Sequence, residues 1–418
     1  MTKISDLPIN LVEEILYRVP VKNMREVRLT CKDWDTLSQS QSFSKMHSAV
    51  RREVESMMIV LMDFNLYLTK VVLSDNEDPT IEYKGKLNKQ IKISQAFHCD
   101  GLLLCVLEDD DTKAIVWNPY WGQTRSIEFR FSHRRRVGPR KVGCDRFKYA
   151  LGYEDKGSCR GYKFLRFIEY YVDYETRKEF DWYEIYDFDS STWKTLDVTP
   201  NSRILCHQEK GGVSLKGNTY WPALQSYPEN YSIDHMICFD FASESFGPLL
   251  RLPFSAGHGD YVTLSCVREE KLAALLTHDE GGPLEFDIWI STKIEAEKVL
   301  WSKFLRVVTE TGFFALVNSR GYFIDEEKKV AMGFAEYDTR TFNIVGEAGY
   351  LKELELVEGL RGNIVYGRAI AYSYVPSLVQ IKQPDAGGKW KHQSDLEKQR
   401  FDQKMSGLVA VKNRIKFW

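Results

Sequence analysis

The chain has 418 residues, of which 43% are hydrophobic and 13% aromatic, which is enough for a large core and more than one domain. Its formal net charge of -2 argues against nucleic acid and anionic membranes as partners. It has no signal-peptide pattern and no run of 18 apolar residues, so we expect a protein of the nucleus, the cytoplasm or both, with no membrane partner.

Residues 1–46 carry the pattern of two or three short amphipathic helices. The first helix follows Asp6 and Pro8, because aspartate caps a helix and proline fits its first turn. Its apolar stripe comprises Leu7, Leu11, Val12, Ile15, Leu16 and Val19. A second run places Met24, Val27, Cys31 and Trp34 at helical spacing. Helices this short bury too little apolar surface to be stable alone, so they need a partner surface or the rest of the chain.

The order Leu-Pro, Leu, Ile-Leu, Val-Pro-Val and Cys-Lys-Asp-Trp in this segment resembles the F-box, a helical module that binds the Skp adaptor of cullin–RING ubiquitin ligases. The resemblance implies a substrate-recognition subunit that reaches the cullin and RING subunits through the adaptor and needs no catalytic residue, cofactor or metal. Carried over residue by residue, it assigns adaptor binding, or support of the binding helices, to Leu7, Pro8, Leu11, Ile15, Leu16, Pro20, Val21, Val27, Cys31 and Trp34. Periodicity alone would favour a plain helical cap on the larger domain.

Residues 47–56 are polar and predict a short helical connector, after which a strand-rich region runs from 57 to 382. This region holds a weak repeat in which a strand ends near an aromatic, a polar turn follows, and an aromatic opens the next strand. The copies are 115–127, 184–196, 237–249, 287–301 and 335–342. Strand pairs that recur about every 40–55 residues are typical of a propeller with four-stranded blades. Five copies and the strands at 57–72 predict about six blades.

A second resemblance rests on pieces that occur in order along the strand-rich region. They are 99–103, 116–119, 149–153, 239–241 and 374–379. Together they resemble the F-box-associated domain of the large plant F-box families, whose repeat is kelch-like. The resemblance implies a multidomain fold: a small all-α F-box at 1–46, then an all-β kelch-like propeller at 57–382 that binds an unidentified target protein. A polar, basic tail occupies 383–418.

Several charged clusters invite a chemical interpretation. The basic cluster Arg134-Arg135-Arg136, with Arg140, Lys141 and Arg146, is either an import signal or acidic-partner contact, or a solvated loop, which charge runs usually are. The acidic run at 108–111 is predicted to be a hairpin tip, because it lacks the spacing of a calcium loop. Asp187, Asp189, Asp240 and Glu244 could pair for hydrolysis, but their repeat positions favour turn roles.

No catalytic constellation is found, and the eight cysteines form no C-x-x-C pair, so we expect reduced core thiols. The rival hypothesis is a propeller enzyme or carbohydrate-binding protein with an accidental helical N-terminus. Histidines or carboxylates with shifted pKa values at the propeller mouth would favour an enzyme, whereas aromatic and arginine side chains would favour protein recognition. A third possibility keeps the F-box but uses the adaptor in another assembly.

Overall fold

The computed structural model describes most of the chain. The described residues are 8–17, 19, 27, 30–38, 56–73, 78–87, 91–130, 147–157, 159–171, 179–198, 200, 202–205, 212–225, 232–257, 259–278, 284–309, 321–334, 341–355, 369–377, 379–383, 399 and 403. The basic cluster at 134–146, residues 47–55 of the predicted connector and nearly all of the tail lie outside them.

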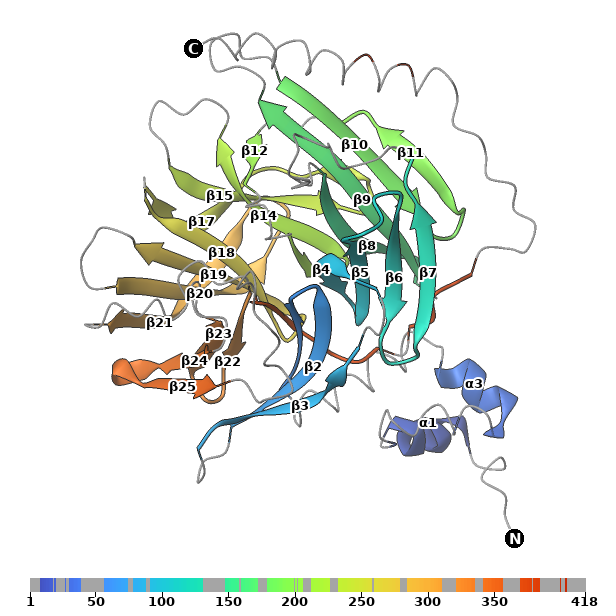
Figure 1. Cartoon of the computed structure of the whole chain (residues 1–418), viewed down its shortest axis with the longest axis horizontal. Helices are drawn as coiled ribbons and strands as arrows, with labels where there is room; N and C mark the ends of the chain where they lie inside the picture. The colour runs from blue at the N-terminus through green and yellow to red at the C-terminus, as the bar shows by residue number, and fades with distance from the viewer. Residues whose placement is uncertain are drawn as a thin grey trace.

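Two helices precede the strands and lie at the edge of the molecule (Figure 1). Helix α1 (Ile9–Tyr17) begins directly after Pro8, whose carbonyl oxygen accepts the amide hydrogens of Leu11 at 2.9 Å and Val12 at 3.2 Å. Proline suits this place because a helix leaves its first amide groups without intrahelical partners. Helix α3 (Lys32–Ser38) follows.

Six antiparallel sheets follow and are arranged as blades around a centre (Figure 1). Blade 1 contains β26 (Ala369–Ser373), β1 (Ser56–Met62), β2 (Asn65–Val72) and β3 (Thr80–Lys86); blade 2 contains β4 (Ile93–Cys99), β5 (Leu102–Leu107), β6 (Lys113–Asn118) and β7 (Gln123–Glu128); blade 3 contains β8 (Lys148–Asp155), β9 (Arg160–Tyr171), β10 (Glu179–Asp187) and β11 (Thr192–Leu196).

The other three blades follow the same plan, with blade 4 the least regular. Blade 4 contains β12 (Ser202–Ile204), β13 (Val213–Leu215), β14 (Asn218–Gln225), β15 (Ile233–Asp240), β16 (Ser245–Phe246) and β17 (Leu250–Ala256); blade 5 contains β18 (Tyr261–Val267), β19 (Lys271–His278), β20 (Leu284–Ile294) and β21 (Val299–Thr309); blade 6 contains β22 (Tyr322–Asp325), β23 (Val330–Phe334), β24 (Thr341–Gly346) and β25 (Leu351–Glu355). The predicted fold, a helical N-terminal region before a six-bladed all-β propeller, is confirmed.

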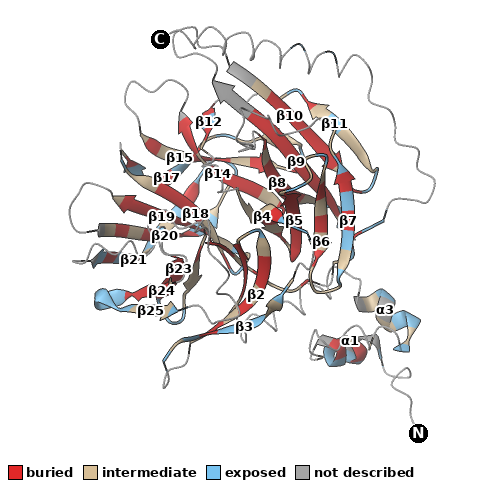
Figure 2. Cartoon of the chain, viewed as in Figure 1, coloured by how far each residue is buried: buried red, intermediate tan, exposed pale blue. Residues whose placement is uncertain are grey.

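The core lies between the blades rather than within any one of them. Each blade is covered by neighbours on both faces, so its inner strands are apolar on both sides instead of alternating. All six residues of β5 and all five of β23 are buried, whereas the outermost strand β7 alternates (Figure 2). Between blades 2 and 3, Val116 packs in one cluster with Tyr149 and Phe164.

The ring is closed by pairing the two ends of the propeller. Strand β26 lies antiparallel to β1, with Val60 opposite Ala371, so blade 1 combines the last strand with the first three. The chain then continues as residues 374–383, which we call the C-terminal strap. The strap crosses blade 2, where the Asn118 side chain donates to the carbonyl oxygens of Ser377 at 3.0 Å and Val379 at 2.7 Å. The ring is therefore closed both by the pairing of β26 with β1 and by the hydrogen bonds of the strap to blade 2.

The turns divide the propeller into two faces. One face carries the turns that join the first strand of a blade to the second and the third strand to the fourth. An ion pair of 2.7 Å joins two of these turns in neighbouring blades, through Arg268 between β18 and β19 and Glu327 between β22 and β23. We call this face the tight-turn face. The longest connections, 129–147, 310–321 and 356–368, join strand ends at the opposite face, which we call the long-loop face.

The repeat copies map onto these turns, with one exception. The copies at 115–127, 184–196, 237–249 and 287–301 each cover a third-to-fourth strand hairpin. The copy at 335–342 instead lies between β23 and β24, the second and third strands of blade 6. This copy is therefore not equivalent to the other four. The same order of an aromatic residue, a polar turn and a second aromatic residue can occur wherever two strands are joined by a turn, so it does not identify which two strands of the blade are joined.

Candidate functional site

Helix α1 has two apolar sides, of which one is buried and the other is exposed. Val12 and Leu16 are 6% and 1% exposed and pack with side chains of the α3 region, among them Trp34. Leu11 and Ile15 are each 44% exposed on the other side of the helix. The apolar stripe predicted from the sequence counts all four residues as one surface. In the structure it is divided into an inward pair, Val12 and Leu16, and an outward pair, Leu11 and Ile15.

The structure places the ten predicted adaptor-binding residues in three groups. Pro8, Leu11 and Ile15 are exposed together along α1. Leu16 is buried and packs in one cluster with the partly buried Val27 and Trp34, so these three support the helices from inside, and Cys31 is partly buried as well. The remaining three, Leu7, Pro20 and Val21, lie outside the described residues.

Two propeller residues join the inward side of α1, and sequence reasoning missed them. Tyr120 and Trp121, in the turn between β6 and β7, pack in the same cluster as Val12 and Leu16. Their rings meet edge to face with centroids 4.9 Å apart. No local pattern predicts this contact, since a helix and a turn about 100 residues apart carry no shared periodicity.

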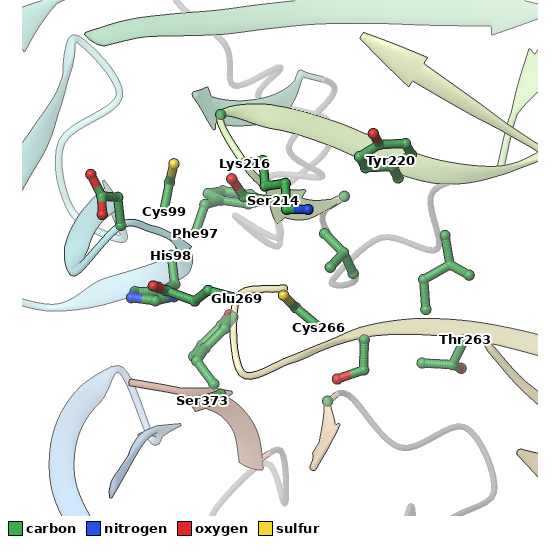
Figure 3. Close-up of a pocket in the computed structure, with 18 of the residues that line it drawn as sticks. Phe97, His98, Cys99, Ser214, Lys216, Tyr220, Thr263, Cys266, Glu269 and Ser373 are labelled. Atoms are coloured by element: carbon green, nitrogen blue, oxygen red, sulfur yellow. The ribbon is translucent and has the colours of Figure 1, made fainter. Parts of the chain in front are cut away.

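A cavity of about 690 Å³ occupies the centre of the propeller (Figure 3). That volume is within the range of small-molecule sites. Its wall is built by the innermost strands and by turns of the tight-turn face, so residues from different blades face one another across it. Those labelled in the figure are Phe97, His98, Cys99, Ser214, Lys216, Tyr220, Thr263, Cys266, Glu269 and Ser373.

The charged groups at one edge of the cavity bind one another. Asp100 accepts hydrogen bonds from both Arg160 and the Tyr162 hydroxyl, and Arg160 lies 4.4 Å from the centre of the Tyr153 ring. Burial opposes the charge of Arg160, but Asp100 outweighs it and raises the pKa of the guanidinium. Burial and the same carboxylate raise the pKa of Tyr162. The arrangement ties blade 2 to blade 3 and keeps Tyr162 protonated.

The histidine and thiols of the cavity are held in neutral forms. Burial lowers the pKa of His98 to about 4, and its Nε2 accepts the Gly101 amide hydrogen at 3.1 Å. Burial raises the pKa of Cys99 and of Cys266 well above the usual thiol value. A protonated thiol is a poor nucleophile, so neither Cys99 nor Cys266 is activated for nucleophilic attack. The expectation of core thiols fails at Cys159, which is exposed.

The carboxylates that might have formed a hydrolytic pair serve turns and ion pairs. Asp187 Oδ1 accepts the Ser190 amide hydrogen at 2.7 Å, and Asp240 Oδ1 accepts that of Ala242 at 2.7 Å. The other two are paired: Asp189 with Lys156 (3.0 Å) and Lys382 (2.5 Å), and Glu244 with Lys163 (2.9 Å) and Lys194 (2.7 Å). The acidic run at 108–111 joins β5 to β6, where a hairpin tip was predicted.

The described residues contain neither a cluster of metal ligands nor a membrane-spanning helix. No three of their histidine, cysteine, aspartate or glutamate side chains are grouped to hold a metal ion. Neither described helix has the length and apolar character needed to cross a bilayer.

The chain matches two known families. Residues 4–46 match the F-box domain, and residues 57–381 match the F-box associated beta propeller domain. The chain belongs to the F-box proteins with an F-box-associated propeller. It is 52% identical to the F-box protein At2g38590 of Arabidopsis thaliana over 98% of each chain. It is also 52% identical to the F-box/kelch-repeat protein At4g33290 of the same plant, over 96% of this F-box protein and 94% of the relative.

Some solved structures share a weak likeness with this F-box protein. The structure of YjhT, for example, matches with a TM-score of 0.36 and 10% identity over 66% of this chain and 93% of its own. That likeness is too low to bear on the fold or the function.

Proposed function

We propose that this F-box protein is the substrate-recognition subunit of a cullin–RING ubiquitin ligase, active in the nucleus, the cytoplasm or both. The outward side of α1 binds a Skp-family adaptor, and the propeller binds the target protein. The observation that carries the proposal is the exposed apolar pair Leu11 and Ile15 on a helix whose inward pair is already covered.

An exposed pair of this kind fits a protein interface. Moving an exposed leucine or isoleucine side chain from water into an apolar interface contributes about 1.5–3 kcal/mol of favourable free energy. Leu11 and Ile15 lie one helical turn apart, so a single apolar groove can cover both together with Pro8. A few such anchors carry most of the energy of a typical interface.

In this role the chain contributes position rather than chemistry. Ubiquitin transfer is accelerated because the assembly holds the target next to the charged enzyme, which raises the effective concentration of the reacting groups. His98 at the propeller centre meets one criterion for an enzyme, because its pKa is shifted, but burial causes the shift and its Nε2 already accepts the Gly101 amide hydrogen. Asp100 is bound by Arg160. The proposal therefore rests on α1 and not on the cavity.

Binding of the purified full-length protein to a Skp adaptor tests the proposal. Leu11→Ala with Ile15→Ala removes two anchors, each worth about 2 kcal/mol, so we expect the Kd to rise at least about 100-fold. The matched control is Leu300→Ala with Val308→Ala, an equally exposed apolar pair on β21 (46% and 48%), which should leave the Kd unchanged. Equal binding by both double variants would refute the assigned surface, and failure of the unaltered protein to bind any adaptor would refute the function.

A further inference from the structure

The turn between β6 and β7 carries large aromatic residues where equivalent turns are polar or small. Asn118, Asp187 and Asp240 each end a third strand and hold the following turn through a side-chain oxygen. The residues two and three positions later are Tyr120 and Trp121 in blade 2, Asp189 and Ser190 in blade 3, and Ala242 and Ser243 in blade 4. The residues in blades 3 and 4 are exposed. Two aromatic rings at such an outward position indicate that blade 2 supports something there.

What they support is the inward side of α1. Tyr120 and Trp121 are partly buried and share one apolar cluster with Val12 and Leu16. Aromatic side chains bury more area than other residues and pack with a defined geometry. The two F-box helices that the structure describes are nine and seven residues long, so this contact adds apolar surface that helices this short lack.

The turn that carries the two rings is held in place by hydrogen bonds to Asn118. The Asn118 side chain is fully buried, and its Oδ1 accepts the amide hydrogens of Tyr120 at 2.9 Å and Trp121 at 3.3 Å. Its Nδ2 donates to two carbonyl oxygens of the C-terminal strap. Gly122 closes the turn at φ +67°, with its amide hydrogen on the Asn118 carbonyl oxygen at 2.9 Å. The rings therefore stand on the same residue that fastens the closed propeller.

We propose that Tyr120 and Trp121 form a docking site, the F-box seat, that holds the F-box helices on blade 2 in one orientation, with Asn118 as its positioning residue. The inference rests on the proposed function for its purpose, because a fixed orientation matters when adaptor and target must face each other. Seating leaves the adaptor surface free, since Val12 and Leu16 are covered by the seat while Leu11 and Ile15 remain outward.

The test replaces the two rings by the residues of the blade 3 turn, Tyr120→Asp with Trp121→Ser, in the full-length protein. The readouts are hydrogen exchange of the amides at 9–17 and protease cleavage between residues 39 and 55. We expect exchange at least about tenfold faster and faster cleavage, because α1 loses its support. The control is Tyr350→Asp, an exposed aromatic (44%) in the turn before β25, which should change neither readout. Unchanged exchange and cleavage in the seat variant would overturn the proposal.

A second variant protects the test against a folding defect. Trp121→Ala removes one ring of the seat from the propeller side, keeps Tyr120 and leaves the packing inside the F-box unaltered, so exchange at 9–17 should also accelerate. If the double seat variant lowers the melting temperature of the propeller, the Trp121→Ala variant decides, and its unchanged exchange would overturn the seat.

Adaptor binding separates the two proposals. The seat variant should still bind the adaptor, with a Kd raised by no more than the factor by which exchange at 9–17 accelerates, because Leu11 and Ile15 are intact and only the opened helix fails to bind. A larger loss of binding would contradict the division of α1 into two sides. If no form of the protein binds an adaptor, the proposed function fails, yet the exchange and cleavage readouts still decide whether the seat exists.

Discussion

Asn118 offers the sharpest test of how the propeller is fastened. It is 0% exposed, and its side chain makes four hydrogen bonds, two accepted from the β6–β7 turn and two donated to the strap carbonyls of Ser377 and Val379. Each such bond contributes about 1 kcal/mol net, and a buried group left unpaired costs about 1–3 kcal/mol. The turn amides can reach water after truncation, so we expect Asn118→Ala to lose about 3 kcal/mol of unfolding free energy.

The assay is calorimetric unfolding of the full-length protein at one scan rate. In a domain of this size 1 kcal/mol shifts the melting temperature by about 2 °C, so the Asn118→Ala variant should melt about 6 °C lower. Asn118→Asp should be at least as damaging, because it keeps the acceptor but turns a carboxylate toward two carbonyl oxygens. The control is Asp240→Asn, whose amide oxygen can still accept the turn hydrogens and which should shift melting by about 1 °C or less. Equal shifts for Asn118→Ala and Asp240→Asn would refute the strap as a fastener.

Three further predictions use the same melting assay. Gly101→Ala should lower the free energy of unfolding by more than about 3 kcal/mol, because φ is +74° and a Cβ would lie 2.2 Å from a strap side chain. Its control, Gly122→Ala, has a similar φ of +67° but open space around the Cβ, so it should lower the free energy of unfolding by about 1 kcal/mol. Equal losses would contradict the close approach of the strap. Glu184→Ala should cost about 3–5 kcal/mol, because it strips the fully buried Arg166 of its carboxylate at 2.7 Å, while Arg166→Met with Glu184→Leu should melt near the unaltered protein. The pKa of His98 is lowered to about 4, so the folded protein binds this proton less readily than the unfolded chain does; its contribution to stability is present above about pH 6.5 and is lost as the pH falls toward 4. The loss is at most about 2 kcal/mol at pH 5, since the ring keeps some exposure, and a His98→Gln variant with the same pH dependence as the unaltered protein would exclude this source.

The blade number could be predicted because four of the six blades repeat a local signal at the end of the third strand, and the copy at 335–342, although out of register, still falls in a blade of its own. Asp187 and Asp240 mark the ends of third strands, and their side chains hold the turns that follow. Such a turn is encoded within four or five residues, so it is visible in the sequence. The closure of blade 1 could not be predicted in the same way. Strand β26 pairs with β1 across about 310 residues, and Ala369–Ser373 is a short apolar run like many others.

The candidate site shows the same limit on the scale of one helix. Spacing identifies Leu11, Val12, Ile15 and Leu16 as apolar, but it does not say which pair faces water, because the two pairs lie on adjacent sides of the helix. The choice is made by tertiary contacts, with Trp34 in the α3 region and with Trp121 in the propeller. The one signal in the sequence for the contact with Trp121 is a contrast between turns: an aromatic stands where blade 3 has Ser190.

The dimensions of the molecule explain why such a seat matters. Strand β8, with eight residues at about 3.3 Å each, gives the propeller a thickness of roughly 25 Å between its two faces. A flexible tether of about 17 residues has a mean span of about 23 Å. A tether of that kind would let the distance between adaptor and target vary by about the thickness of the propeller. Under the proposed function, the contact of Tyr120 and Trp121 with α1 at the tight-turn face would instead give a bound target one defined distance from the adaptor.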